Sequence, residues 1–386
     1  MNPMIERIPS GASSVWAKLR GRQLQTTGRL AALAFGSFLL VLAENSGYTK
    51  AQSGGQGLFG MLQGQADPVG LAMGGRAPVW GPVGLGGAVV NPALLENAMG
   101  HRWFGGWARR PAGLSQGAFV LGIKPPTAPT STGMWYGAWG LQATTAGTMT
   151  QTDAFGNAHG TFQAGEAALQ GVLAHRFHPN LNWGLQTSIF SSFLGPYTAW
   201  GVGCNIGLRY IDTTHQWGLS LLLEDVQLVL RDYVTRSARP ELPPARLSLL
   251  MTNRLKYLPL RWSLGLNNLQ NWSLNYNDPN DPYQSTNLDL SGSETTTQKA
   301  PWLDAVNELY LHLVLNAELQ IGQALRIRGG YQALQRTEWA FPERSGSSGF
   351  TWGLGLGNQR YRLDIGTGAL TLAGRRTALA LSWNLH

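Results

Sequence analysis

Hydrophobic and polar residues alternate along much of this chain from about residue 101 onward. The clearest stretch is 198–210, where one face is small or polar and the other is apolar, formed by Trp200, Val202, Cys204, Ile206, Leu208 and Tyr210. Period-two alternation predicts a β-strand with one apolar face. Strands of soluble sandwiches usually have only about 5 or 6 residues. Aromatic residues at both ends of such a strand match the girdles of a membrane-spanning barrel.

The same pattern recurs in the segments 217–223, 260–266, 309–321 and 350–356, of which 309–321 is the longest. Counting such segments predicts about 14 strands. A barrel closes by pairing its last strand with its first, and residues 379–385 alternate up to the C-terminus. The pattern therefore predicts an all-β fold, a transmembrane antiparallel β-barrel formed by residues 101–386.

Composition narrows the alternatives to this barrel. Only 13% of the residues are charged, whereas about a quarter are charged in an ordinary soluble protein. No apolar run reaches the roughly 18 residues that a spanning helix needs, which leaves a closed barrel as the spanning architecture. Composition alone leaves a large soluble β-sandwich open.

The first 51 residues are expected to be a signal peptide and leader. Arg20, Arg22 and Arg29 precede a short apolar run over 30–43, as in a secretory signal. The preferred cleavage junction follows Ala51, with Ala43 as the competing site, and a short membrane anchor is the alternative reading. The leader carries much of the formal charge of +8; residues 52–386 hold 23 basic and 19 acidic side chains, about +4. That balance does not favour a nucleic-acid partner.

Residues 52–100 differ from the rest because they are rich in glycine and almost uncharged. Asn91 is a good N-cap and Pro92 suits a first helical position, so a short helix is expected to start there. Such a segment has no core of its own and must pack against something larger. We expect an N-terminal plug, or hatch, inside the lumen, with Asn91 and Pro92 fixing its geometry and Ala93 and Leu94 packing against the wall.

The sequence offers little chemistry. It has no nucleophile elbow and no phosphate-binding loop, and we expect no catalytic residue, no metal site and no cofactor. Glu224 and Asp225 are interpreted as a solvated strand end. Long polar loops are expected at 231–245 and 277–303, and loops often carry function. We therefore treat Asp278, Pro279 and Asp281 as candidates for partner contact.

Several motifs in order resemble a known family. Asn91-Pro92-Ala93 ahead of about 14 strands resembles the FadL-like outer-membrane barrels, whose founding members take up long-chain fatty acids. Residues 153–166, 268–279 and the tail from 372 resemble the PorQ family of the type IX secretion system within that superfamily. The family pattern includes acidic residues ahead of the Asn-Pro-Ala, whereas residues 76–90 here contain none. This departure puts an ionic latch made by those acids in doubt.

The resemblance implies a non-enzymatic barrel in the outer membrane of a Gram-negative-type bacterium. It would anchor a protein of the complex that attaches secreted proteins to the cell surface, with outer-membrane lipids around it. The alternative is a FadL-like transporter for hydrophobic small molecules. From the residues themselves we expect aromatic anchors at the two membrane interfaces, namely Trp200, Tyr210, Trp217, Trp262, Trp352 and Trp383.

Overall fold

The computed structural model describes residues 66–81, 83–123, 134–233, 245–274, 301–338, 346–358, 360–371 and 374–384. The expected leader 1–51, the first plug residues 52–65 and the partner-loop candidates Asp278, Pro279 and Asp281 lie outside these ranges. No helix among the described residues is long and apolar enough to cross a membrane.

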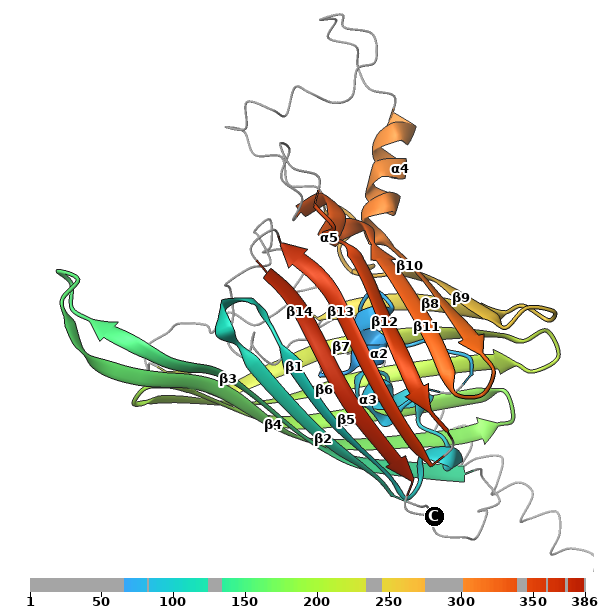
Figure 1. Ribbon diagram of the computed structural model, residues 1–386, viewed down its shortest axis with the longest axis horizontal. Helices are drawn as coiled ribbons and strands as arrows, with labels where there is room; N and C mark the ends of the chain where they lie inside the picture. The colour runs from blue at the N-terminus through green and yellow to red at the C-terminus, as the bar shows by residue number, and fades with distance from the viewer. Residues whose placement is uncertain are drawn as a thin grey trace, which may run out of the picture. The chain divides into compact units, whose positions relative to one another are not determined.

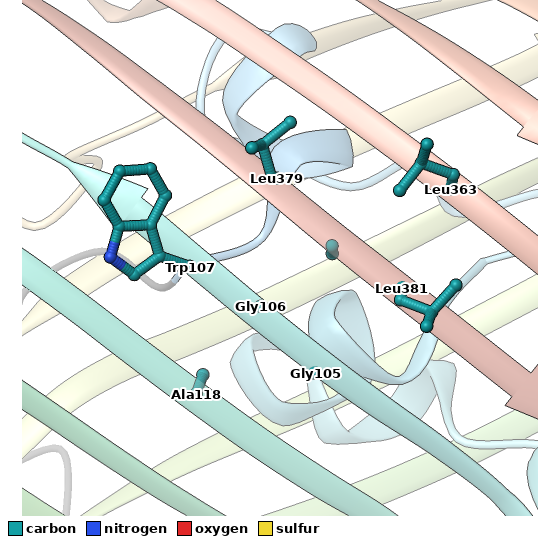
Figure 2. A pocket seen from close by; sticks show the side chains of 8 residues that line it. Gly105, Gly106, Trp107, Ala118, Leu363, Leu379 and Leu381 are labelled. Atoms are coloured by element: carbon teal, nitrogen blue, oxygen red, sulfur yellow. The ribbon is translucent and has the colours of Figure 1, made fainter.

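The described strands form one closed antiparallel barrel in which each strand pairs with its sequence neighbours and β14 pairs with β1 (Figure 1). This confirms the predicted barrel of about 14 strands. Asn384 lies opposite Arg102 and Thr377 opposite Arg109 across the closing pair. The strands are β1 Arg102–Arg109, β2 Ser115–Ile123, β3 Met134–Thr152, β4 Ala158–His178, β5 Leu181–Leu194, β6 Tyr197–Asp212, β7 Trp217–Arg231, β8 Arg246–Arg254, β9 Leu260–Leu266, β10 Leu313–Ile321, β11 Leu325–Gln332, β12 Phe350–Gly357, β13 Tyr361–Thr371 and β14 Gly374–Asn384.

The two ends of the barrel differ. The terminal rim is the end where β1 begins and β14 ends, and the loop rim is the opposite end. Helices α4 (Pro301–His312) and α5 (Ala333–Glu338) lie at the loop rim, where Figure 1 shows α4 projecting from the barrel. The β3–β4 hairpin also turns at the loop rim, through residues 153–157.

Alternation along the strands sorts side chains into an outer and an inner face, as the pattern in 198–210 predicts. Trp200 and Leu208 are exposed on the outside of β6, whereas Ala199 and Arg209 are fully buried inside. In β7, Leu221 lies beside Leu208 of β6 and Leu249 of β8 and is 39% exposed. An outer face of exposed leucines is what a membrane-spanning barrel presents to lipid.

One expected strand is wrong in part. The stripe at 309–321 is not a single strand, because residues 301–312 form α4 and β10 begins only at Leu313. Leu313 pairs with Leu266, the last residue of β9, so residues before Leu313 have no β9 partner. A helix satisfies their backbone groups internally.

Short helical segments between residues 66 and 100 lie inside the barrel, where Figure 1 shows α2 and α3 enclosed by strands. They are α2 Pro68–Ala72, α3 Leu85–Val90, η2 Pro92–Leu94 and η3 Asn97–Met99, and a further turn, η4 Pro111–Gly113, joins β1 to β2. Leu85, Val89 and Leu94 of this segment form one buried apolar cluster with Phe104 and Val120 of the wall. The described residues 66–100 therefore pack inside the lumen, where a plug is expected.

A charge placed on the outer face should destabilise the barrel in lipid. Leu221→Arg puts a guanidinium among outward leucines, and we expect a loss of about 2–4 kcal/mol in the free energy of unfolding. Thr213→Arg, in the exposed turn between β6 and β7, is the matched control and should cost less than about 1 kcal/mol. Urea unfolding in lipid vesicles measures both; equal losses would show that the Leu221 face does not meet lipid.

Candidate functional site

The plug rests on a set of inward-facing glycines, which we call the glycine seat. A Cβ added to Gly184 would collide with the carbonyl of Pro92 and lie 2.6 Å from the Ala93 nitrogen. A Cβ on Gly353 would lie 2.5 Å from that of Ala72. Plug backbone also comes too close for any side chain at Gly106, Gly122, Gly330 and Gly366, and the Asn91 side-chain oxygen does so at Gly207. Glycine on the inner face thus lets the plug backbone approach the wall directly.

The Asn-Pro-Ala turn lies in this seat. The Asn91 side chain caps η2 by accepting a hydrogen bond from the Ala93 N–H at 3.3 Å. Its amide Nδ2 donates to Ser220 Oγ on β7 at 2.8 Å. Pro92, Ala93 and Leu94 are buried against the wall. The structure therefore places the four predicted motif residues together at the plug–wall contact, although the helix there is a single 3-10 turn.

A buried ion pair joins the plug to the wall between Arg76 and Glu224 of β7. The guanidinium is bidentate, with Nη2 at 2.5 Å from Oε1 and Nη1 at 2.7 Å from Oε2. Arg76 Nε also donates to Asn267 Oδ1 at 3.0 Å, and Nη2 donates to Ser248 Oγ at 2.9 Å. Because residues 76–90 contain no acid, an ionic latch made by acids of the plug was in doubt. The structure has an ion pair of the opposite polarity, in which the plug supplies the arginine and the wall supplies the glutamate.

Glu224 and Asp225 are not the solvated strand end that we expected. They lie within β7, and Glu224 is only 2% exposed. Asp225 has a φ of 59° at an irregularity in the β6–β7 pairing, where its N–H donates to Asn205 Oδ1 at 2.9 Å. The extra residue brings both carboxylates to Arg246, at 3.3 Å from Glu224 and 2.5 Å from Asp225. Nothing in the local sequence marks this bulge.

Further ion pairs hold charges inside the lumen. Glu96, at the end of the plug, accepts from Arg209 Nη1 of β6 at 2.6 Å, and Arg209 Nε donates to the Val79 carbonyl at 2.9 Å. On the wall itself, Arg261 pairs with Glu318, and Arg328 bridges Glu318 and Asp364. Pairing offsets the cost of burying such charges.

Asp67 lies near the start of the described part of the plug, next to Ala66. Its carboxylate caps α2 by accepting from the N–H of Val69 at 3.1 Å and of Gly70 at 3.0 Å. Burial raises the pKa of Asp67 to about 6, against the lowering effect of those two N–H groups. Asp67 also packs closely against α3 of the plug, since a Cβ added to Gly86 would lie 3.1 Å from the Asp67 carboxyl. The cap and the close packing together fix the position of α2 in the lumen.

The predicted aromatic anchors all lie on the outer face. At the terminal rim, the Tyr210 and Trp217 rings are 5.4 Å apart, and Trp383 packs at 5.4 Å against both Trp103 and Tyr361. Trp135 and Trp183 extend this band. Trp262 stands near the same rim, whereas Trp200 and Trp352 stand toward the loop rim. Sequence reasoning missed Trp103, Trp135, Trp183 and Tyr361, whose strand-end positions were the available signal.

No group of three or more potential metal ligands occurs among the residues that the structure describes. Cys204 is a free thiol on β6. The inward-facing charged groups are engaged mainly in holding the plug and in wall ion pairs. This arrangement of charged side chains is suited to holding a plug in place inside the lumen.

Comparison with solved structures finds other barrels. The toluene transporter TodX of Pseudomonas putida is 13% identical, with 85% of this chain and 96% of that chain covered and a TM-score of 0.44. A Pseudomonas aeruginosa FadL homologue is 11% identical, with coverages of 83% and 98% and a TM-score of 0.42. The KdgM porin is 6% identical, with coverages of 74% and 99% and a TM-score of 0.29. No family model and no curated protein matches this chain.

The glycine seat can be tested at one position. Gly184→Ala forces a methyl group into the Pro92 carbonyl, and we expect a loss of about 1–3 kcal/mol in unfolding free energy. Gly171→Ala is the control, because its Cβ would make only ordinary side-chain contacts, with Trp139 at 3.4 Å and Thr187 Oγ1 at 3.5 Å. It should change stability by about 0.5 kcal/mol or less. Denaturant titration compares them; a Gly184→Ala variant as stable as the control would refute the tight contact.

Breaking the Arg76–Glu224 pair should loosen the plug. Arg76→Met leaves the buried Glu224 carboxylate with only Arg246, and we expect a loss of about 3–5 kcal/mol. Adding Glu224→Gln should restore more than half of that loss, because the uncompensated charge is then gone. Unfolding titrations and single-channel conductance in planar bilayers provide the measurements. If the single and double variants lose the same stability, the ion pair is not what holds the plug.

Proposed function

We propose that this chain is a non-enzymatic outer-membrane barrel that anchors a partner of the surface-attachment complex of type IX secretion. The observation that carries the proposal is an exposed apolar stripe on α4, at the loop rim. Trp302, Val306 and Leu309 follow helical spacing and are 66%, 52% and 43% exposed. Apolar residues grouped in this way on a projecting helix are typical of a protein-contact surface. The loop rim would then face the cell exterior.

The base of α4 is firmly held, as a docking helix requires. His312 is fully buried, and its two ring nitrogens face the carbonyls of Asn267 and Trp272 within hydrogen-bonding distance. Its ring also stacks on Trp272, with centroids 5.1 Å apart. Near the same end, Glu308 accepts from the Leu274 N–H at 2.9 Å. These contacts stabilise the orientation of the stripe, so a partner meets a preformed surface.

The plug also favours anchoring. Ion pairs at Arg76 and Glu96 and the glycine seat bind it to strands on several sides of the lumen. An anchor needs a stable wall and gains from a fixed plug, whereas a channel needs a path past it. The PorQ-like motif order in the sequence supplies the secretion-system part of the proposal. The partner-loop candidates Asp278, Pro279 and Asp281 stay candidates for further contact.

Transport of hydrophobic small molecules is the second candidate. It is favoured by the buried apolar cluster between plug and wall, which includes Val79, Val83 and Val89. A hydrophobic ligand could pass there only if the plug moved, because these side chains already pack together. Uptake and anchoring therefore make opposite demands on the plug–wall contact.

The anchoring function can be tested on the stripe itself. The double substitution Trp302→Gln with Val306→Gln removes apolar surface from α4 without touching the barrel. We expect recovery of surface-attachment components with the tagged protein from mild detergent to fall at least tenfold. Asn307→Gln, exposed and off the stripe, is the matched control and should retain them. Heat-modifiable gel mobility checks that each variant still folds.

A deletion strain separates the two candidates. Anchoring predicts that surface attachment of secreted proteins is lost while uptake of labelled fatty acids is normal. Loss of fatty-acid uptake with normal surface attachment would overturn the anchoring proposal and support transport.

A further inference from the structure

Three arginines line the inside of the barrel at its terminal rim. Arg102 begins β1, Arg326 is the second residue of β11 and Arg362 the second of β13. Ile327 and Leu363, the next residues along, are exposed on the outer face, so strand alternation directs Arg326 and Arg362 inward. Arg102 shares its face with the buried Phe104. In Figure 1 these strand ends lie at the end of the barrel marked C.

None of these three arginines has a hydrogen-bond or ion-pair partner among the described residues. Arg326 is only 9% exposed, and its Nη1 is shielded and unpartnered, as is Arg102 Nε. The nearby acids are already engaged, since Glu318 and Asp364 pair with Arg261 and Arg328. These two acids pair with two arginines, and none of the other three arginines has a hydrogen-bonded acid among the described residues.

The strands between these arginines carry small inward residues. Gly355 of β12 lies opposite Arg326, and Gly357 lies opposite Arg362. On β14, Ser382 lies opposite Arg362 and Asn384 opposite Arg102. The register displaces Arg362 from Arg326 by two strands and two residues. It displaces Arg102 from Arg362 by the same amount. Neighbouring arginines are therefore about 12 Å apart on the sheet, which two such side chains can span to reach one ion.

We propose that these arginines, hereafter the arginine triad, form an anion site that takes a phosphate group. An uncompensated buried guanidinium is costly, and a bound anion removes that cost. The planar fork of arginine matches phosphate oxygens in bidentate geometry, and phosphate supplies more charge than chloride. The phosphate could be free in solution or belong to a lipid headgroup. This site is independent of the anchoring proposal, because it lies at the other rim and needs no partner protein.

Thermal unfolding of the purified full chain tests the site. The chain is held in an uncharged detergent, tryptophan fluorescence reports Tm, and inorganic phosphate is titrated against sodium chloride at matched ionic strength. We expect phosphate to raise Tm saturably by about 2–4 °C, with a smaller effect of chloride. Arg326→Gln should raise Tm in phosphate-free buffer, by removing an unpaired charge, and should abolish the phosphate shift.

Two further variants keep the result interpretable. Arg362→Gln should also remove the shift, and it serves if Arg326→Gln fails to fold. Arg360→Gln removes an exposed arginine at the same rim, one that lies over the Tyr361 ring at 5.6 Å, and should leave the shift intact. Equal shifts from chloride and phosphate would overturn the site, as would a shift that survives in both Arg326→Gln and Arg362→Gln.

A lipid arm identifies the source of the phosphate. Phosphatidylglycerol or a neutral glycolipid is added to the same detergent solution. A shift with inorganic phosphate assigns a soluble anion. A shift with phosphatidylglycerol alone, lost in Arg326→Gln, assigns a headgroup, and both results support the site. No shift with either probe overturns it.

Discussion

The pairing of β14 with β1 is the contact on which the rest of this protein depends. Within lipid, a wall of strands is stable only if every backbone N–H and C=O bonds inside the wall, and this pairing removes the two free edges. Once the wall closes, its outer face must be apolar and its inner face is released from that demand. The alternation of exposed leucines with buried polar and small residues along β6 and β7 follows from this single condition.

Closure of so many strands leaves a wide lumen, and the described N-terminal segment packs inside it by three means. Backbone approaches backbone where wall glycines leave room, as between Gly184 and Pro92 or between Gly366 and Pro68. Charged groups that no lipid could accept meet one another inside, as Arg76 and Glu224 do. Apolar packing around Leu94 occupies the space between these contacts. A plug held by all three is part of the folded wall, which is why an anchoring role suits it better than a gating one.

The remaining features lie at the two rims of the barrel. At the loop rim, α4 carries an apolar stripe on a base fixed by His312, and this is where a protein partner would bind. At the terminal rim, the arginine triad concentrates positive charge that the wall's own acids do not neutralise. Protein contact and anion binding are thereby separated by the length of the barrel. Neither site depends on the chemistry of the other.

Much of this architecture is determined by the sequence alone. The barrel, its approximate strand number and the plug all follow from local patterns. Period-two alternation shows which residues of a strand face lipid and which face the lumen, and a glycine-rich uncharged segment must be buried against other parts of the chain. The Asn91-Pro92 turn is also local, since a cap and its proline are adjacent in the chain.

Other features were decided only by tertiary structure. Leu309 and Leu311 fit a strand pattern, yet β9 ends at Leu266 and offers them no partner, so they form α4. Glu224 lies 148 residues from Arg76, and only the bulge at Asp225 and the seating of the plug bring the two charges together. Such pairings depend on which strands become neighbours, and no local pattern in the chain records that.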